Sequence, residues 1–587
     1  MTQVRLALCL CGIFVWASAA ASASEHFDVI FDRDIAVTMR DGTILRADIY
    51  RPKADGKFPV LITRTPYDKQ DERETCAIAA ENGYVAIAQD VRGRYESDGE
   101  WYPFKYESAD GFDTVEWAAA LPYSNGKVGM FGSSYVGATQ LLAAIAHPPH
   151  LSAIFAGETA SNYHDGWAYQ GGALEQWMNE SWTARLSWDT LDRRLRKETD
   201  ARQWIEKLPL NSFPVQMTAP QENLAPYFFD WLAHPSYDDF WKQWSIEDHL
   251  DQINVPVFHT GAWYDIFLGG TLRNYVGLRV RAGSEEARHG QRLLIGIGGH
   301  AGSGQKVGEI DFGPQATAGE GEDDLMLRWY DYLLKGISNG IDQEKPVKIF
   351  VLGKNVWRQE DAWPLARAKS TPFYLQSSVN ATTAAGDGTL TQQAPTSKLS
   401  SSTFTYDPAN PVPTHGGPLC CDRNRMPAGP MDQRTVEDRK DVLVYTTPAF
   451  QQDFEVTGPV SCKLYVSSSA QDTDFTAKLV DVWPNGYAQN LTESILRMRY
   501  RNTPKKPELM EPDTVYPITI DMAATSNVFL AGHRLRLEVS SSNFPRFDRN
   551  LNTGEEQATG TRMVKAASSV WHDLAHPSAL ILPVVPQ

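Results

Sequence analysis

Short apolar runs alternate with segments of helical pattern from residue 24 to about residue 161. Strands are predicted at 43–50, 58–63, 84–90 and 128–131, and helices at 72–82, 111–120 and 141–145. A further run at 35–39 forms a hairpin with 43–50 through Asp41-Gly42, a common turn sequence. Alternating strands and helices predict a mostly parallel, doubly wound sheet, with functional loops at the carboxyl ends of its strands.

The pattern changes twice in the rest of the chain. From 162 to 250, Val- and Ile-rich strands are missing and tryptophans are interleaved with charged residues, which favours an inserted helical cap. Strand-like runs resume within 251–370, at 255–260 and 292–297. From 371 to 587, short strands follow one another across Gly- and Ser-rich turns, a pattern typical of a β-sandwich. The predicted fold class is therefore α/β: a core of 24–161 and 251–370, a helical cap, and a C-terminal β-sandwich.

The first 23 residues have the pattern of a cleavable signal peptide. Arg5 precedes an apolar segment, Leu6 to Trp16, which is too short to span a bilayer. Ala21-Ser22-Ala23 fits a cleavage site, with Ala17-Ser18-Ala19 as the second choice. The mature protein is expected to be periplasmic or secreted.

Charge limits the choice of partner. The 55 basic and 72 acidic residues leave a formal net charge of -17. Such a balance argues against nucleic acid or an anionic membrane as a partner and favours a small molecule. The sequence leaves the oligomeric state open, including a homo-oligomer.

Four cysteines remain after signal removal: Cys76, Cys420, Cys421 and Cys462. The adjacent Cys420 and Cys421 could bond to each other or elsewhere, or remain thiols, and four cysteines allow three full pairings. The spacing lacks the pairs typical of zinc sites, so no metal and no cofactor is expected.

The sequence Gly132-Ser-Ser134-Tyr-Val-Gly137 joins a predicted strand to a predicted helix. A serine between strand and helix in a glycine-bounded turn is typical of the nucleophile elbow. Ser134 is favoured over Ser133 because Gly132 then lies two residues before the nucleophile. The alternative is an ordinary glycine-rich turn of a doubly wound sheet.

An aspartate and a histidine follow two later strands. Asp265 comes soon after the run at 255–260, and His300 soon after the run at 292–297. The order Ser134, Asp265, His300 is that of the α/β-hydrolases. In that arrangement His300 is the general base for Ser134, and Asp265 fixes the imidazole tautomer. His259 and Asp90 are weaker candidates, because His259 lies within a strand and Asp90 precedes the nucleophile.

A tetrahedral oxyanion needs two hydrogen-bond donors. The backbone N–H of Tyr135, directly after the nucleophile, is one candidate. The other donor must come from the loop Thr65-Pro66-Tyr67, where Pro66 has no N–H to give. The Tyr67 hydroxyl is therefore the predicted second donor, although a half-buried aromatic at a strand end is the plainer interpretation.

These motifs resemble the X-Pro dipeptidyl-peptidase superfamily of serine hydrolases, over nearly the whole mature chain. The likeness is greatest to cocaine-esterase-like acyl hydrolases, with α-amino acid ester hydrolases and glutaryl acylases as relatives. It rests on 64–69, 89–93, 132–137, 261–265, 299–300, 406–413, 415–417, 542–546 and 552–554. The resemblance implies an α/β-hydrolase core, a jelly-roll C-terminal domain, Tyr67 as oxyanion donor, and an acyl pocket lined by Trp167, Trp182 and Phe267.

One position departs from the family's pattern. α-Amino acid ester hydrolases carry a carboxylate two residues after the oxyanion tyrosine, where this chain has Lys69. A neutral or acidic acyl group is therefore expected rather than an α-amino group. The predicted function is hydrolysis of carboxylic esters, with amides second, through an acyl-enzyme. The alternatives are an X-Pro dipeptidyl-peptidase or α-amino acid ester hydrolase, and, outside enzymes, a carbohydrate-binding or scaffold protein.

Overall fold

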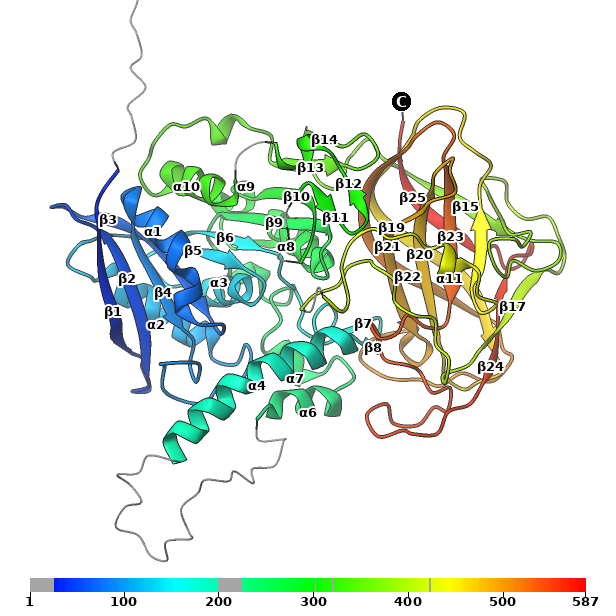
Figure 1. The fold of residues 1–587 in the computed structure, drawn as a ribbon, viewed down its shortest axis with the longest axis horizontal. Coiled ribbons are helices and arrows are strands. Elements are labelled where there is room, and N and C mark those ends of the chain that lie inside the picture. The colour runs from blue at the N-terminus through cyan, green and yellow to red at the C-terminus, as the bar shows by residue number, and fades with distance from the viewer. Residues whose placement is uncertain are drawn as a thin grey trace, which may run out of the picture.

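The computed structural model describes residues 26–198, 224–300, 302, 304–318, 321–421 and 424–586 (Figure 1). The predicted signal peptide lies outside the described residues. Within them, ten strands form one sheet in the order β1-β2-β4-β3-β5-β6-β9-β10-β13-β14. Their bounds are β1 Val29–Thr38, β2 Ile44–Pro52, β3 Phe58–Thr65, β4 Val85–Asp90, β5 Ser124–Ser133, β6 Leu151–Gly157, β9 Val257–Tyr264, β10 Arg292–Gly299, β13 Val347–Val351 and β14 Val356–Glu360.

The centre of this sheet is parallel, as predicted. All pairs from β4 through β3, β5, β6, β9 and β10 to β13 are parallel, whereas β1–β2, β2–β4 and β13–β14 are antiparallel. The Asp41-Gly42 turn closes the β1–β2 hairpin, with Gly42 at φ 85°, a conformation that glycine adopts without strain. The carboxyl ends of the parallel strands therefore meet at one edge.

Helices cover both faces of the sheet (Figure 1). The described helices of the core are α1 Arg73–Glu81, α2 Glu107–Ala119, α3 Tyr135–Ile145, α8 Leu268–Arg281, α9 Glu285–His289 and α10 Glu322–Leu333. One buried cluster joins α1 and α10 to the sheet, and another joins α2 and α3 to its opposite face. Each strand of the parallel centre is thus buried on two sides, which explains its near-continuous apolar sequence.

Helix α2 begins four residues before the predicted start at Gly111. Its first residue, Glu107, is 3% exposed and pairs with buried Arg64 at 2.9 Å. Charged residues in the first turn of a helix do not contribute to the apolar pattern from which the helix was predicted. The predicted helix therefore began later, where apolar positions recur. The prediction of this boundary was wrong for that reason.

The segment predicted as a cap contains β7 Tyr169–Gln170, β8 Ala173–Leu174, α4 Gln176–Glu198, α6 Pro226–Ala233 and α7 Asp239–Lys242. Aromatic residues of α4 and α6 pack with those of the core in one buried cluster. The described part of this insertion is thus mainly helical, and it places its aromatic face against the core beside α3.

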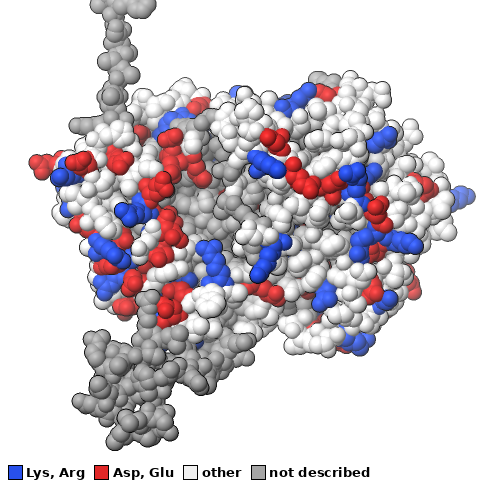
Figure 2. Space-filling model, viewed as in Figure 1, with Lys and Arg blue, Asp and Glu red and all other residues white. Residues whose placement is uncertain are grey.

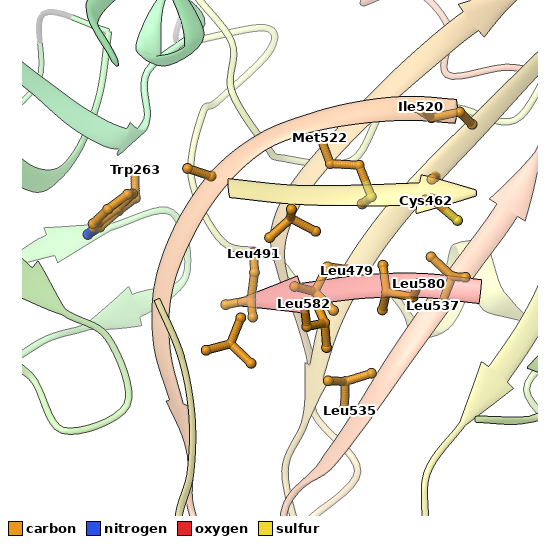
Figure 3. Close-up of a cluster of buried hydrophobic side chains, with 14 of the residues drawn as sticks. Trp263, Cys462, Leu479, Leu491, Ile520, Met522, Leu535, Leu537, Leu580 and Leu582 are labelled. Atoms are coloured by element: carbon orange, nitrogen blue, oxygen red, sulfur yellow. The ribbon is translucent and has the colours of Figure 1, made fainter. Parts of the chain in front are cut away.

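The C-terminal part is a β-sandwich. Its elements are β15 Lys369–Gln376, β16 Thr389–Thr391, β17 Ser401–Tyr406, α11 Arg434–Glu437, β18 Leu443–Thr446, β19 Phe454–Ser468, β20 Asp474–Val482, β21 Ala488–Arg497, β22 Tyr516–Phe529, β23 Arg534–Ser540, β24 Ala566–Trp571 and β25 Ala579–Val585. Figure 3 shows apolar side chains of β19, β22 and β25 facing those of β20, β21 and β23. Trp263 of β9 belongs to the same buried cluster, so the sandwich core continues into the end of the α/β sheet.

A buried ionic contact ties the sandwich to the cap. Arg546 is 2% exposed and pairs with Glu493 of β21 at 2.9 Å and with Glu175, next to α4, at 3.3 Å. Burial raises the pKa of Glu175 to about 7, against the opposing effect of Arg546. Removing one partner would leave a buried charge without its counterion, which is far costlier than losing a surface pair.

Basic side chains on the visible face do not form a surface suited to binding a polyanion. On the face in Figure 2, Lys and Arg side chains are scattered among Asp and Glu, and no continuous basic area is seen. Among the described residues, no helix has both the length and the apolar character needed to cross a bilayer.

Candidate active site

Ser134 occupies the sharp turn between β5 and α3. Its backbone has φ 65° and ψ −128°, a conformation that side-chain-bearing residues rarely adopt. A Cβ on Gly132 would lie 2.2 Å from Val136, and one on Gly137 would lie 2.6 Å from the carbonyl oxygen of Gly157. Only glycine fits at both places, which explains why this turn is bounded by glycines. This geometry is that of a nucleophile elbow.

Three predicted residues form one hydrogen-bonded line. His300 Nε2 lies 2.9 Å from Ser134 Oγ, and His300 Nδ1 lies 2.9 Å from Asp265 Oδ1. Asp265 directly follows β9 and His300 directly follows β10, so the parallel sheet brings both to the edge that carries Ser134. The Phe267 backbone N–H also donates to Asp265 Oδ1, at 3.1 Å, which holds the carboxylate in place. This arrangement can pass a proton from serine to histidine.

The competing residues lie elsewhere. Ser133 belongs to β5, where it is the register partner of Gly157. His259 is buried in β9 with its Nε2 2.8 Å from Gln291, and burial lowers its pKa to about 4. Asp90 ends β4 and accepts hydrogen bonds from Lys69. Of the two candidate nucleophiles, Ser134 is the one whose Oγ lies within hydrogen-bond distance of His300.

Tyr67 lies just past β3, the strand next to β5 in the sheet. The Trp182 Nε1–H donates to the Tyr67 hydroxyl oxygen at 3.0 Å, and Ser134 is close enough to the hydroxyl to lower the Tyr67 pKa. The Tyr67 backbone N–H is already bonded to Thr65 Oγ1 at 3.1 Å, and that of Lys69 to Asp90 at 2.8 Å. The hydroxyl is therefore the polar group of this loop that faces the nucleophile.

Tyr135 supplies a different kind of group. It is the first residue of α3, and the first N–H groups of a helix have no partner within the helix. Its side chain is fully buried, where the hydroxyl donates to Glu107 at 2.8 Å and accepts from the Phe104 N–H at 2.9 Å. The ring thus anchors the start of α3, and the backbone N–H stays beside Ser134.

The protonation of Tyr67 leads to a prediction for alkaline solution. Burial raises the pKa of Tyr67 above its ordinary value, although hydrogen bonds with Trp182 and Ser134 oppose the effect. A raised pKa keeps the hydroxyl a donor up to at least pH ~10. We expect kcat/KM for an ester with a non-ionising leaving group to stay level between pH ~8 and ~10. A fall with a midpoint well below pH 10 would contradict a Tyr67 donor.

The three predicted pocket aromatics lie together beside this line. Trp167 stacks on Phe267 with ring centroids 4.5 Å apart, and Phe267 meets His300 edge-on at 5.0 Å. Trp182 packs edge-on against Trp167 at 5.5 Å. All three are at most 3% exposed. The cap and the loop after β9 therefore form an apolar wall next to the histidine.

The C-terminal part also reaches this wall. Cys420 and Cys421 form a vicinal disulfide, the first of the arrangements left open by the sequence, while Cys76 and Cys462 are buried thiols. Cys420 packs in the buried cluster that contains Trp167, Trp182 and Phe267. Nothing in the local sequence indicates such a contact, because it joins parts of the chain more than a hundred residues apart.

Lys69 takes no part in the site. Its side chain is fully buried, 2.8 Å from Asp34 and 3.2 Å from Asp90. The ammonium is therefore neutralised beneath the loop and offers no charge to a substrate. The difference from the α-amino acid ester hydrolases is therefore the lack of a carboxylate at position 69, and not the presence of a positive charge.

One charged residue near the site has no counterpart among the predicted residues. Glu158 directly follows β6, and its Oε2 lies 3.6 Å from His300 Nδ1. Ligand atoms of Glu158, Asp265 and His300 lie within 4.8 Å of one another, the kind of group that could hold a metal ion. The same atoms form the hydrogen-bonded line, so an ion there would compete with it. The sequence analysis did not predict the strand that precedes Glu158. Glu158 was therefore not recognised as a residue at the carboxyl end of a strand.

Comparisons with known proteins place the chain in a family. Residues 41–302 match the model of the X-Pro dipeptidyl-peptidase (S15 family), and 339–581 match the X-Pro dipeptidyl-peptidase C-terminal non-catalytic domain. Cocaine esterase from Rhodococcus sp. (strain MB1 Bresler) is 38% identical over 574 residues, covering 94% of this chain and 98% of the esterase.

Solved structures show the same fold. An aminopeptidase from the marine sediment archaeon Thaumarchaeota archaeon has a TM-score of 0.80 at 26% identity, covering 96% of this chain and 98% of its own. An α-amino acid ester hydrolase has a TM-score of 0.77 at 24% identity, covering 97% of this chain and 100% of its own. The second likeness concerns the fold alone.

Proposed function

On the premise that the chain belongs to the X-Pro dipeptidyl-peptidase (S15) family and is a serine hydrolase of carboxylic esters, we propose a preferred substrate class. The protein cleaves esters of aromatic acids through an acyl-enzyme on Ser134. The observation that carries the proposal is the stack of Trp167 and Phe267 against His300. A flat acyl group beside the nucleophile would meet aromatic faces and edges there.

The proposed reaction has two halves. Ser134 Oγ attacks the ester carbonyl while His300 Nε2 takes its proton, and Asp265 stabilises the imidazolium. The Tyr67 hydroxyl and the Tyr135 backbone N–H donate to the oxyanion. His300 returns the proton to the departing alcohol, leaving an acyl-serine. Water, deprotonated by His300, then repeats the attack and releases the acid.

Peptidase activity on X-Pro substrates is the weaker proposal, because it needs an anion to hold a substrate ammonium. The candidate carboxylate, Glu158, lies by His300 Nδ1, whereas Ser134 lies by Nε2. The two nitrogens are on opposite sides of the ring. Glu158 is therefore not placed beside an acyl group attached to Ser134.

The test of acyl preference compares two p-nitrophenyl esters that share a leaving group. The parent enzyme should hydrolyse the benzoate with a higher kcat/KM than the acetate. Phe267→Leu should reduce that preference by about 3- to 10-fold, because an aromatic pair contributes roughly 0.5–1.5 kcal/mol beyond its buried area. Phe229→Leu, at a 43% exposed position on α6, is the matched control and should leave the preference unchanged. A parent enzyme that prefers the acetate would refute an aromatic acyl pocket.

We further propose that the protein is exported. The support is the signal-like pattern of residues 1–23, together with a disulfide in the folded chain, since disulfides persist in oxidising compartments. Full-length protein expressed in a Gram-negative host should be recovered from the periplasm or medium with Ser24 at its N-terminus. Cytosolic protein that keeps Met1 would contradict export.

A further inference from the structure

Strands β5, β6, β9 and β10 are consecutive neighbours in the sheet (Figure 1). Ser134, Asp265 and His300 follow three of them. Glu158 follows the remaining one, β6, which lies between the strands of the nucleophile and of the aspartate. The proposed mechanism gives this carboxylate no task.

The backbone fixes Glu158 in an unusual conformation. Its φ is 42°, which residues with side chains adopt infrequently, and its N–H donates to the Thr260 carbonyl oxygen at 2.8 Å. That bond ties the end of β6 to β9, whose next loop carries Asp265. The side chain is thereby directed at the same ring nitrogen that Asp265 contacts.

Two carboxylates thus share His300 Nδ1, Asp265 at 2.9 Å and Glu158 at 3.6 Å. Asp265 is buried, and its Oδ2 has no hydrogen-bond partner among the described residues, whereas the Glu158 side chain keeps 14% exposure. Two further contacts of this histidine that the structure describes, the Ser134 hydroxyl and the Phe267 ring, carry no charge. A positive charge on the imidazole therefore lies next to both carboxylates.

We propose that Glu158 is a positioning residue of the active site, a second carboxylate that holds the Nδ1–H tautomer of His300 and stabilises its charged form alongside Asp265. The inference rests on the proposed Ser134–His300–Asp265 function. Asp265 and Glu158 lie at different distances from His300 Nδ1. If Asp265 is lost, Glu158 still holds the imidazole ring in part.

The first test is the acid limb of the pH profile of kcat/KM. The base must be neutral to act, so the limb reports loss of the imidazolium proton. Glu158→Gln removes a negative charge beside the ring and should move the limb to lower pH by about one unit. Glu286→Gln, which removes an exposed carboxylate on α9, is the control and should leave the limb in place. A Glu158→Gln limb that coincides with that of the parent overturns the proposal.

The second test is a double-mutant cycle with Asp265→Asn. If Glu158 holds the ring when Asp265 cannot, adding Glu158→Gln to Asp265→Asn should cost at least ~10-fold more in kcat than adding it to the parent, because the parent still has Asp265 to hold the ring. An equal factor in both backgrounds overturns the proposal. Thermal unfolding of all four proteins shows whether each is folded.

Labelling with a fluorophosphonate distinguishes failure of the proposed function from failure of the role of Glu158. If the parent is not labelled at Ser134, the proposed function itself fails. If parent and Glu158→Gln are both labelled and share one acid limb, only the role of Glu158 fails.

Discussion

Ser134→Ala should abolish ester hydrolysis while leaving the fold intact. In serine hydrolases, removing the nucleophile costs on the order of a millionfold in kcat. Alanine keeps the Cβ, so the strained turn at φ 65° gains no new backbone restriction. The hydroxyl lost is the one 2.9 Å from His300 Nε2. The measurements are kcat on an activated ester, fluorophosphonate labelling and thermal unfolding.

Ser133→Ala is the matched control for this variant. Ser133 lies one residue earlier, in β5, and should keep both turnover and labelling. If Ser133→Ala were inactive and Ser134→Ala active, the register of the elbow would be wrong. If folded parent protein were neither labelled nor active on any ester, the carbohydrate-binding or scaffold protein considered from the sequence would gain support.

Much of the fold was predictable because it depends on local pattern. Apolar runs of strand length separated by helical segments predicted the parallel sheet. The succession of short strands after residue 371 predicted the sandwich, and both predictions are confirmed. The family resemblance is confirmed as well. Boundaries failed where a buried charge replaced an apolar residue, as at Glu107.

The candidate site was predictable in part for a topological reason. Parallel strands end at one edge, so residues that follow successive strands must lie near one another even though no distance can be read from the sequence. That reasoning placed Asp265 and His300 beside Ser134. It missed Glu158 because β6 had not been recognised. It could not find Cys420, since contact between separate parts of a chain leaves no periodic signal.

The contact between Tyr67 and Trp182 links the cap to the chemistry. The indole N–H of Trp182 donates to the Tyr67 oxygen, which leaves the hydroxyl proton free to point elsewhere. Ser134 is a second group near that hydroxyl, and its interaction lowers the Tyr67 pKa. Helix α4 therefore leaves the Tyr67 proton available for the proposed oxyanion, because Trp182 already occupies the hydroxyl oxygen as a donor. Pro66 and the occupied amides of Tyr67 and Lys69 leave this loop little else to donate.

Tyr67→Phe should lower kcat by about 100- to 1000-fold, or roughly 3–4 kcal/mol of transition-state stabilisation. The ring stays, so its packing against the cap should survive. KM should change little where it reports binding, because the hydrogen bond strengthens only as charge develops on the carbonyl oxygen. Both formation and breakdown of the acyl-enzyme pass through an oxyanion, so both should slow in single-turnover measurements. The control is thermal stability: a matching loss of fold would leave only a structural role. Activity within a few-fold of the parent would rule out the hydroxyl and direct attention to the backbone amide of Asp68.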